Sequence, residues 1–64
     1  MTQKELLYVE DAINHEKNII SILKESINYS SDNTIKDFFN EKLNDHIALK
    51  TELLNLLEDL ANEW

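Results

Sequence analysis

The sequence predicts an all-α fold in which two long helices form an antiparallel hairpin, and two copies of that hairpin form a four-helix bundle. Three observations support this prediction. The 64 residues include neither glycine nor proline, apolar residues recur at helical spacing in both halves, and one short polar segment separates the halves. We expect a single domain, residues 1–64, with a first helix at about 3–28, a turn at about 29–33 and a second helix at about 34–62.

The first helix is expected to begin at a capping box, because Thr2 is followed three residues later by Glu5. Its apolar side chains fall in four adjacent rows that together span about 160° of the helix surface. The rows are Leu6, Ile13, Ile20 and Ile27; Val9, Glu16 and Leu23; Ala12, Ile19 and Ser26; and Tyr8, His15, Ile22 and Tyr29. The other rows are polar except for Leu7. An arc this broad suits a helix that packs against two others.

The segment Asn28–Thr34 is predicted to be the turn, because Ser, Asp and Asn favour caps and turns over helix interiors. Asp32 is the expected N-cap of the second helix, and a cap at Thr34 paired with Asp37 is the alternative. With no glycine available, Asn28 or Asn33 is expected to take a left-handed conformation.

The second helix also carries a broad apolar stripe. Its rows are Ile35, Leu49 and Leu56; Phe39, His46, Leu53 and Leu60; Leu43, Leu57 and Trp64; and Ile47, Leu54 and Ala61. Three lysines at the edges of this stripe are expected to extend their ammonium groups into water: Lys36, Lys42 and Lys50. The aromatic side chains are expected in the core or at the ends of the bundle: Tyr8, Tyr29, Phe38, Phe39 and Trp64.

Two helices joined by a short turn leave half of each broad stripe open to water, more apolar surface than a soluble monomer normally exposes. A chain this small also buries only about 60% of its unfolded surface by itself. We therefore expect the chain's partner to be a second copy of itself, in a homodimer.

A thin polar layer interrupts both stripes. Glu16 and His46 are equidistant from residue 31 in the turn, so an antiparallel hairpin brings them to the same height. His15 lies at the stripe edge at that level. A twofold axis would bring two copies of all three residues toward the centre of the bundle.

Two interpretations of this layer are open. Carboxylate and imidazole ligands that project inward from four helices build iron or zinc sites. The alternative is a Glu–His network that satisfies itself and fixes the register of the helices. Di-metal sites of this kind require Glu-x-x-His on one helix, and Leu43 occupies the glutamate position here. The sequence therefore favours the structural network, with Glu16, His46 and His15 as the candidates for a mononuclear site.

Composition argues against several functional classes. The net charge is −7, and the chain has no arginine and no cluster of lysines, which disfavours binding to nucleic acid or to anionic membranes. No apolar run is long enough for a membrane span or a signal peptide. Serine triads and glycine-rich phosphate loops are not encoded, so we expect neither an enzyme nor a cofactor.

The segment Lys4–Lys17 resembles the first helix of small spore-coat-type proteins of spore-forming Firmicutes, which are related to the spore coat F family. Its specific part is Glu-Asp-Ala-x-x-His-Glu-Lys at residues 10–17, and Leu43–His46 agrees with the register of that family's second helix. The resemblance covers residues 4–60. It implies a ferritin-like hairpin with a non-enzymatic role in sporulation, other spore coat proteins as partners, and a location in the cytoplasm or the spore coat. It also implies that Glu16 and His46 match ferritin-like ligand positions, from which Leu43 departs.

Two other functions remain open at this point. The chain resembles the Rop family of RNA-binding hairpins, but the outer face of its first helix lacks the basic and aromatic character of that family. It is also compatible with a small acidic regulator that inhibits a kinase or another protein by helix-in-groove binding.

Overall fold

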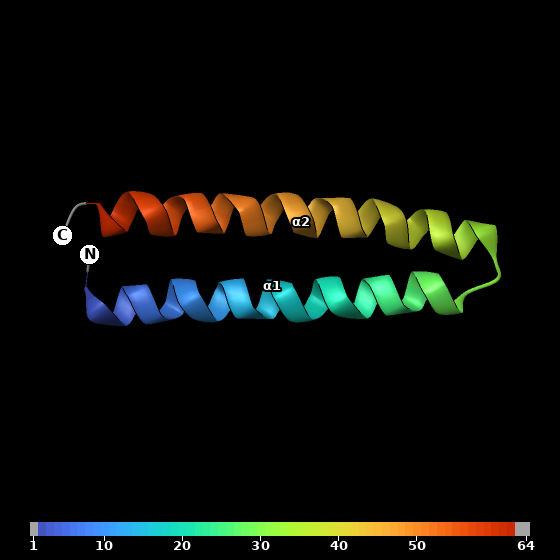
Figure 1. The fold of residues 1–64 in the computed structure, drawn as a ribbon, viewed down its shortest axis with the longest axis horizontal. Coiled ribbons are helices and arrows are strands. Elements are labelled where there is room, and N and C mark those ends of the chain that lie inside the picture. The colour runs from blue at the N-terminus through green and yellow to red at the C-terminus, as the bar shows by residue number, and fades with distance from the viewer. Residues whose placement is uncertain (1, 63–64) are drawn as a thin grey trace.

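The structure is a computed structural model that describes residues 2–62, and it is an antiparallel hairpin of two helices. Helix α1 spans Gln3–Tyr29 and helix α2 spans Asn33–Ala61, each within one residue of its expected bounds. The helices lie side by side along their full length, with the start of α1 beside the end of α2 and the turn at the opposite end (Figure 1). The molecule is an elongated rod of 48 × 15 × 11 Å.

The start of α1 is fixed by the predicted capping box. The Thr2 hydroxyl accepts from the backbone N–H of Glu5, and the Glu5 carboxylate accepts from the backbone N–H of Thr2, both at 3.1 Å. These bonds satisfy amide groups that the first turn of a helix leaves without partners. Hydrogen bonds from the backbone and side chain of Thr2 hold the pKa of the Glu5 carboxyl below its usual value.

Asp32 caps α2, as expected, and the alternative cap at Thr34 is not used. Asp32 Oδ1 accepts from the backbone N–H groups of Thr34 at 2.8 Å and Ile35 at 3.3 Å. Within the turn, the Ser30 hydroxyl accepts from the backbone N–H of Asp32 at 3.2 Å. A short network of polar side chains therefore orders the connection.

The prediction that Asn28 or Asn33 adopts a left-handed conformation is wrong. No non-glycine residue among residues 2–62 has a positive φ angle. The chain leaves α1 through Ser30, in extended backbone at φ −72° and ψ 139°, and enters α2 from Asp32, which is also extended. Two extended residues reverse the chain direction without the left-handed step that a tighter helix end requires.

The core is thin. Only three of the described residues are buried, and all three lie on one stripe of α1: Ile13, Glu16 and Ile20, at 4%, 9% and 7% exposure. Across from them, the stripe of α2 contains no buried residue among those described: the described members of its rows at Phe39 and Leu43 are half-buried, and the apolar members of its rows at Ile35 and Ile47 are exposed. The three lysines expected at its edges, Lys36, Lys42 and Lys50, are also half-buried. Each helix thus buries a single stripe against the other.

Replacing Asp32 with alanine should lower the free energy of unfolding by about 1 kcal/mol, because the N–H groups of Thr34 and Ile35 lose their acceptor. Urea unfolding followed by circular dichroism at one fixed protein concentration measures the loss. Asp32→Asn is the matched control, since asparagine caps about as well as aspartate. An equal loss in both variants would assign the effect to the charge and not to the cap.

Candidate functional site

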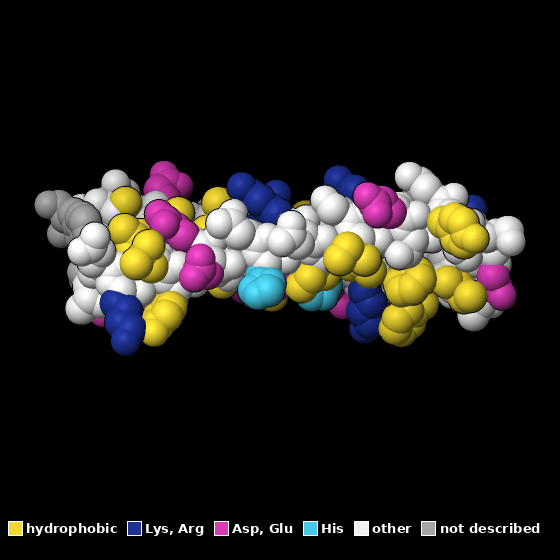
Figure 2. Space-filling model, turned by 90° about the horizontal axis from the view of Figure 1, so that it is seen from below, with side chains coloured by type: hydrophobic (Ala, Val, Ile, Leu, Met, Phe, Trp, Pro, Cys, Tyr) yellow, Lys and Arg dark blue, Asp and Glu magenta, His cyan; other side chains and the backbone are white. Residues whose placement is uncertain are grey.

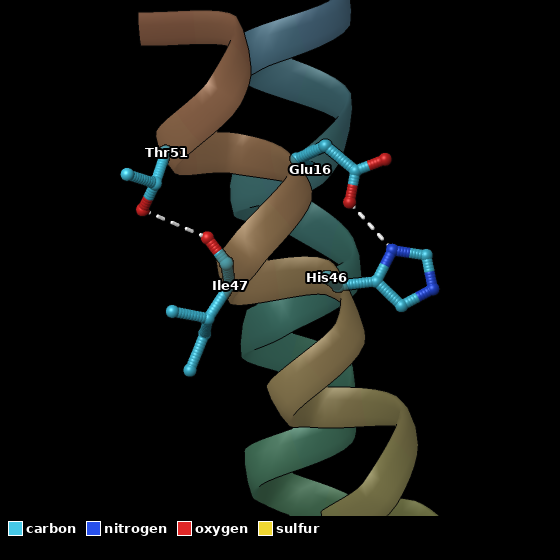
Figure 3. A network of polar contacts seen from close by, with 4 residues as sticks. All are labelled: Glu16, His46, Ile47 and Thr51. Atoms are coloured by element: carbon cyan, nitrogen blue, oxygen red, sulfur yellow. Dashed lines mark hydrogen bonds and ion pairs between the residues drawn. The ribbon is translucent and has the colours of Figure 1, made fainter. Parts of the chain in front are cut away.

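Glu16 and His46 meet at the middle of the hairpin. His46 Nδ1 lies 2.5 Å from Glu16 Oε2, and this is the one side-chain hydrogen bond between α1 and α2 among residues 2–62. The Glu16 side chain is 11% exposed and that of His46 is 30% exposed. Figure 3 shows the carboxylate and the ring reaching toward each other from the two helices.

As a carboxylate, Glu16 is the acceptor in this contact. A carboxylate only accepts hydrogen bonds, so His46 Nδ1 donates to Glu16 and the second ring nitrogen is left to face away from it (Figure 3). Burial of a carboxylate without a partner is costly. His46 therefore supplies the partner that allows an acid to sit between Ile13 and Ile20 in the apolar stripe of α1.

Within residues 2–62, no other side chain forms a hydrogen bond with the pair. Near it, the Thr51 hydroxyl donates to the backbone carbonyl of Ile47 at 3.0 Å, within α2, and Figure 3 shows this bond on the other side of the helix from Glu16. His15, the third predicted member of the layer, is exposed, and no hydrogen bond joins it to the pair within residues 2–62. In the single chain the layer therefore consists of two residues.

The pair alone does not form a metal centre in one chain. Among the described residues, no three His, Asp or Glu side chains are grouped so that they could hold a metal ion. Leu43, three residues before His46, is half-buried and offers no ligand atom. The chemistry that the contact supports within one chain is a hydrogen bond that aligns two helices.

The larger feature is an apolar face that runs beside the pair, which we call the open face. It combines one row of α1 with one row of α2, and every apolar member is between 42% and 94% exposed. Its members are Tyr8, His15, Ile22 and Tyr29 on α1, and Ile35, Lys42, Leu49 and Leu56 on α2. Hydrophobic side chains and both histidines gather along the lower edge of Figure 2.

Two shallow hollows locate these rows on the two sides of the hairpin. Near the turn, Tyr29 of α1 and Ile35 of α2 line one open hollow of about 450 Å³, so their rows share a side. On a second hollow, of about 280 Å³, Glu10 and Lys17 of α1 lie with Leu54 of α2. The exposed α1 residues that line this second hollow are polar, so among residues 2–62 the open face is the side with exposed apolar rows on both helices.

Most of the aromatic side chains are not buried in the single chain. Phe39 is half-buried and packs edge to face with Phe38, with ring centroids 5.9 Å apart. Phe38, Tyr8 and Tyr29 are exposed, and Trp64 lies outside the described residues. Burial of the three exposed rings by a bundle stays a prediction.

Comparisons of the sequence with protein-family models and curated proteins, and of the fold with solved structures, find no match for this chain. Neither described helix is both long enough and apolar enough to cross a bilayer.

A double-mutant cycle of Glu16→Ala and His46→Ala should give a coupling energy of about 1–2 kcal/mol, because the buried carboxylate loses its one described partner. Helicity should persist in all variants, since the caps and the apolar side chains of both stripes are unchanged. Urea unfolding at one protein concentration provides the four free energies. A control cycle at the exposed residues Glu25 and Asn44 should give a coupling near zero, and equal coupling in the two cycles would contradict the assignment.

Proposed function

We propose that this protein is a non-enzymatic structural protein that acts by self-association, with two hairpins forming a homodimeric four-helix bundle. The partner is a second copy of the same chain, and the open face is the contact surface. The Glu16–His46 pair aligns the helices and takes part in no reaction.

The observation that carries this proposal is the surface area of the hairpin. Its accessible area is 4926 Å², whereas a compact monomer of 7.5 kDa exposes about 4,200 Å². The excess of about 700 Å² is close to the roughly 800 Å² that each partner buries in a standard protein interface. A contact of that size on the open face would bring the accessible area of each chain to that of an ordinary compact protein.

The polar pair supports the same proposal. A buried acid–imidazole contact adds little net stability compared with apolar residues, but it penalises any register in which the two groups are separated. Glu16 and His46 sit at mid-length, where a slip of one helix along the other would separate them. Such a pair suits a structural protein whose contacts must form in one alignment.

For the biological setting, we propose the spore coat. The support is the resemblance of residues 4–60 to spore-coat-type proteins, and above all the Glu-Asp-Ala-x-x-His-Glu-Lys string at residues 10–17. In this setting the protein would be made in the cytoplasm and would join other coat proteins through bundle formation.

A second candidate is a small acidic regulator that binds one protein partner. The observation that favours it is the net charge of −7 on a hairpin with one open apolar face. A basic amphipathic helix could pack its apolar side on that face and pair its cations with the surrounding acids. The two candidates differ in the state of the purified protein. A structural protein is dimeric alone, and a regulator is monomeric until its partner is added.

Replacing Ile22 with aspartate should convert the dimer to a monomer, because a charge would then lie within the apolar contact of the open face. Sedimentation equilibrium measures the change, and we expect the dissociation constant to rise at least about 100-fold, the equivalent of about 2.7 kcal/mol. Ser21→Asp, on an exposed row about 100° around α1 from Ile22, is the matched control and should stay dimeric. A dimer in both variants would show that the contact surface lies elsewhere.

An epitope-tagged copy expressed during sporulation should be recovered in the coat extract of mature spores, since the proposed setting is coat assembly. Its Ile22→Asp variant should be depleted there if assembly depends on the open face. Immunoblots of coat and soluble fractions make the comparison. Wild-type protein found only in the soluble fraction would contradict the proposed setting while leaving self-association intact.

A further inference from the structure

We infer that the second copy docks on the open face in the opposite direction, with the two turns at opposite ends of the bundle. The twofold axis then crosses the bundle at the level of the Glu16–His46 pair. This inference rests on the proposed self-association and adds the orientation, which determines the residues that meet across the interface.

The first observation is an asymmetry of charge along the rod. The half nearest the chain ends, residues 2–15 and 47–62, carries two lysines and six acidic residues, a net charge of −4. The half nearest the turn, residues 17–45, carries four lysines and five acidic residues, a net charge of −1. The hairpin therefore has one strongly acidic end and one nearly neutral end.

This asymmetry separates the two possible orientations. A parallel dimer places both acidic halves side by side, at separations of about 10 Å, where charges still interact at moderate salt concentration. An antiparallel dimer places each acidic half beside the half that holds four of the six lysines: Lys17, Lys24, Lys36 and Lys42. The antiparallel arrangement separates the two −4 halves and sets each beside a half of net charge −1, so it reduces the repulsion between the copies at both ends of the bundle.

The second observation is the symmetry of the open face on α1. Tyr8 and Ile22 each lie seven residues from His15, so an antiparallel copy of this row places Tyr8 opposite Ile22 of the second copy. His15 then lies opposite its own copy, next to the level of Glu16. The row thus pairs with itself about the middle of the hairpin.

The row on α2 shows the same symmetry. In the antiparallel dimer, Ile35 lies at the same height as Leu56 of the second copy, and Lys42 lies at the same height as Leu49. Both pairs are centred between residues 45 and 46. That centre lies beside His46, at the level already set by the row on α1. In the parallel arrangement the two Lys42 residues would share one level at the interface, whereas the antiparallel arrangement sets each against a leucine.

The lower edge of Figure 2 agrees with this centre. Both histidines lie near mid-length, with hydrophobic side chains on either side of them. A twofold axis at this level gathers the polar side chains of both copies in one layer and leaves apolar contacts in the two outer thirds of the bundle. The antiparallel orientation is thus the one favoured by the charge distribution, by the symmetry of both rows of the open face and by the position of the polar layer.

The chain has no cysteine, so a single substitution gives one site for a nitroxide label. We would place labels at Ser31→Cys in the turn and, as a matched control, at Asn44→Cys on an exposed position near mid-length. Pulsed electron–electron dipolar spectroscopy of the dimer then measures the distance between the two copies of each label.

For Ser31→Cys we expect a separation of about 45 Å, since about 30 residues at 1.5 Å each lie between the two turns. A separation of about 20 Å, two helix spacings, would overturn the antiparallel orientation and leave self-association intact. Asn44→Cys should give a distance below about 35 Å in either orientation, because the label lies near the centre. No dipolar coupling at either position would overturn the orientation and the dimer together.

Discussion

Two helices can bury only the surface that each presents to the other, and this limit governs the structure. The described chain buries three residues, all on α1, and the row beside them stays exposed on both helices. The apolar arc of each helix is nevertheless wide enough to contact two neighbours. In the proposed dimer the hairpin is one half of a core, and the second copy supplies the other half.

The Glu16–His46 contact matters because of where it lies. In an apolar stripe, leucines and isoleucines at equivalent positions tolerate a shift of one helical turn with little loss of burial, so apolar packing sets register weakly. A buried carboxylate does not tolerate such a shift, because it would lose its donor. One polar contact at mid-length thus supplies the specificity that the apolar rows lack, in each hairpin and in the proposed dimer.

Local rules predicted much of this fold. Short-range hydrogen bonding, which depends on residues close together in the sequence, determines the capping box at Thr2, the cap at Asp32 and the single turn. The meeting of Glu16 and His46 follows from their equal distance from the turn. These features can be predicted without knowing how each helix is rotated about its own axis.

The features that were not predicted depend on that rotation or on the path of the chain. Periodicity gave the full apolar arc of α1 but not which row would face α2, so the exposure of Tyr8, His15 and Ile22 was visible only in the structure. A left-handed asparagine was expected in place of the missing glycine, whereas the chain takes an extended path through Ser30 and Asp32 that no single residue type encodes. How α1 and α2 turn toward each other is set by packing along the whole length of both.

The most direct test of this account is the dependence of wild-type unfolding on protein concentration. If a second copy completes the core, the protein sediments at twice 7.5 kDa, and its cooperative urea midpoint rises as the concentration increases from about 1 to 100 μM. A monomer that unfolds cooperatively at a midpoint independent of concentration would contradict the central claim, because the hairpin would then be stable with its open face in water.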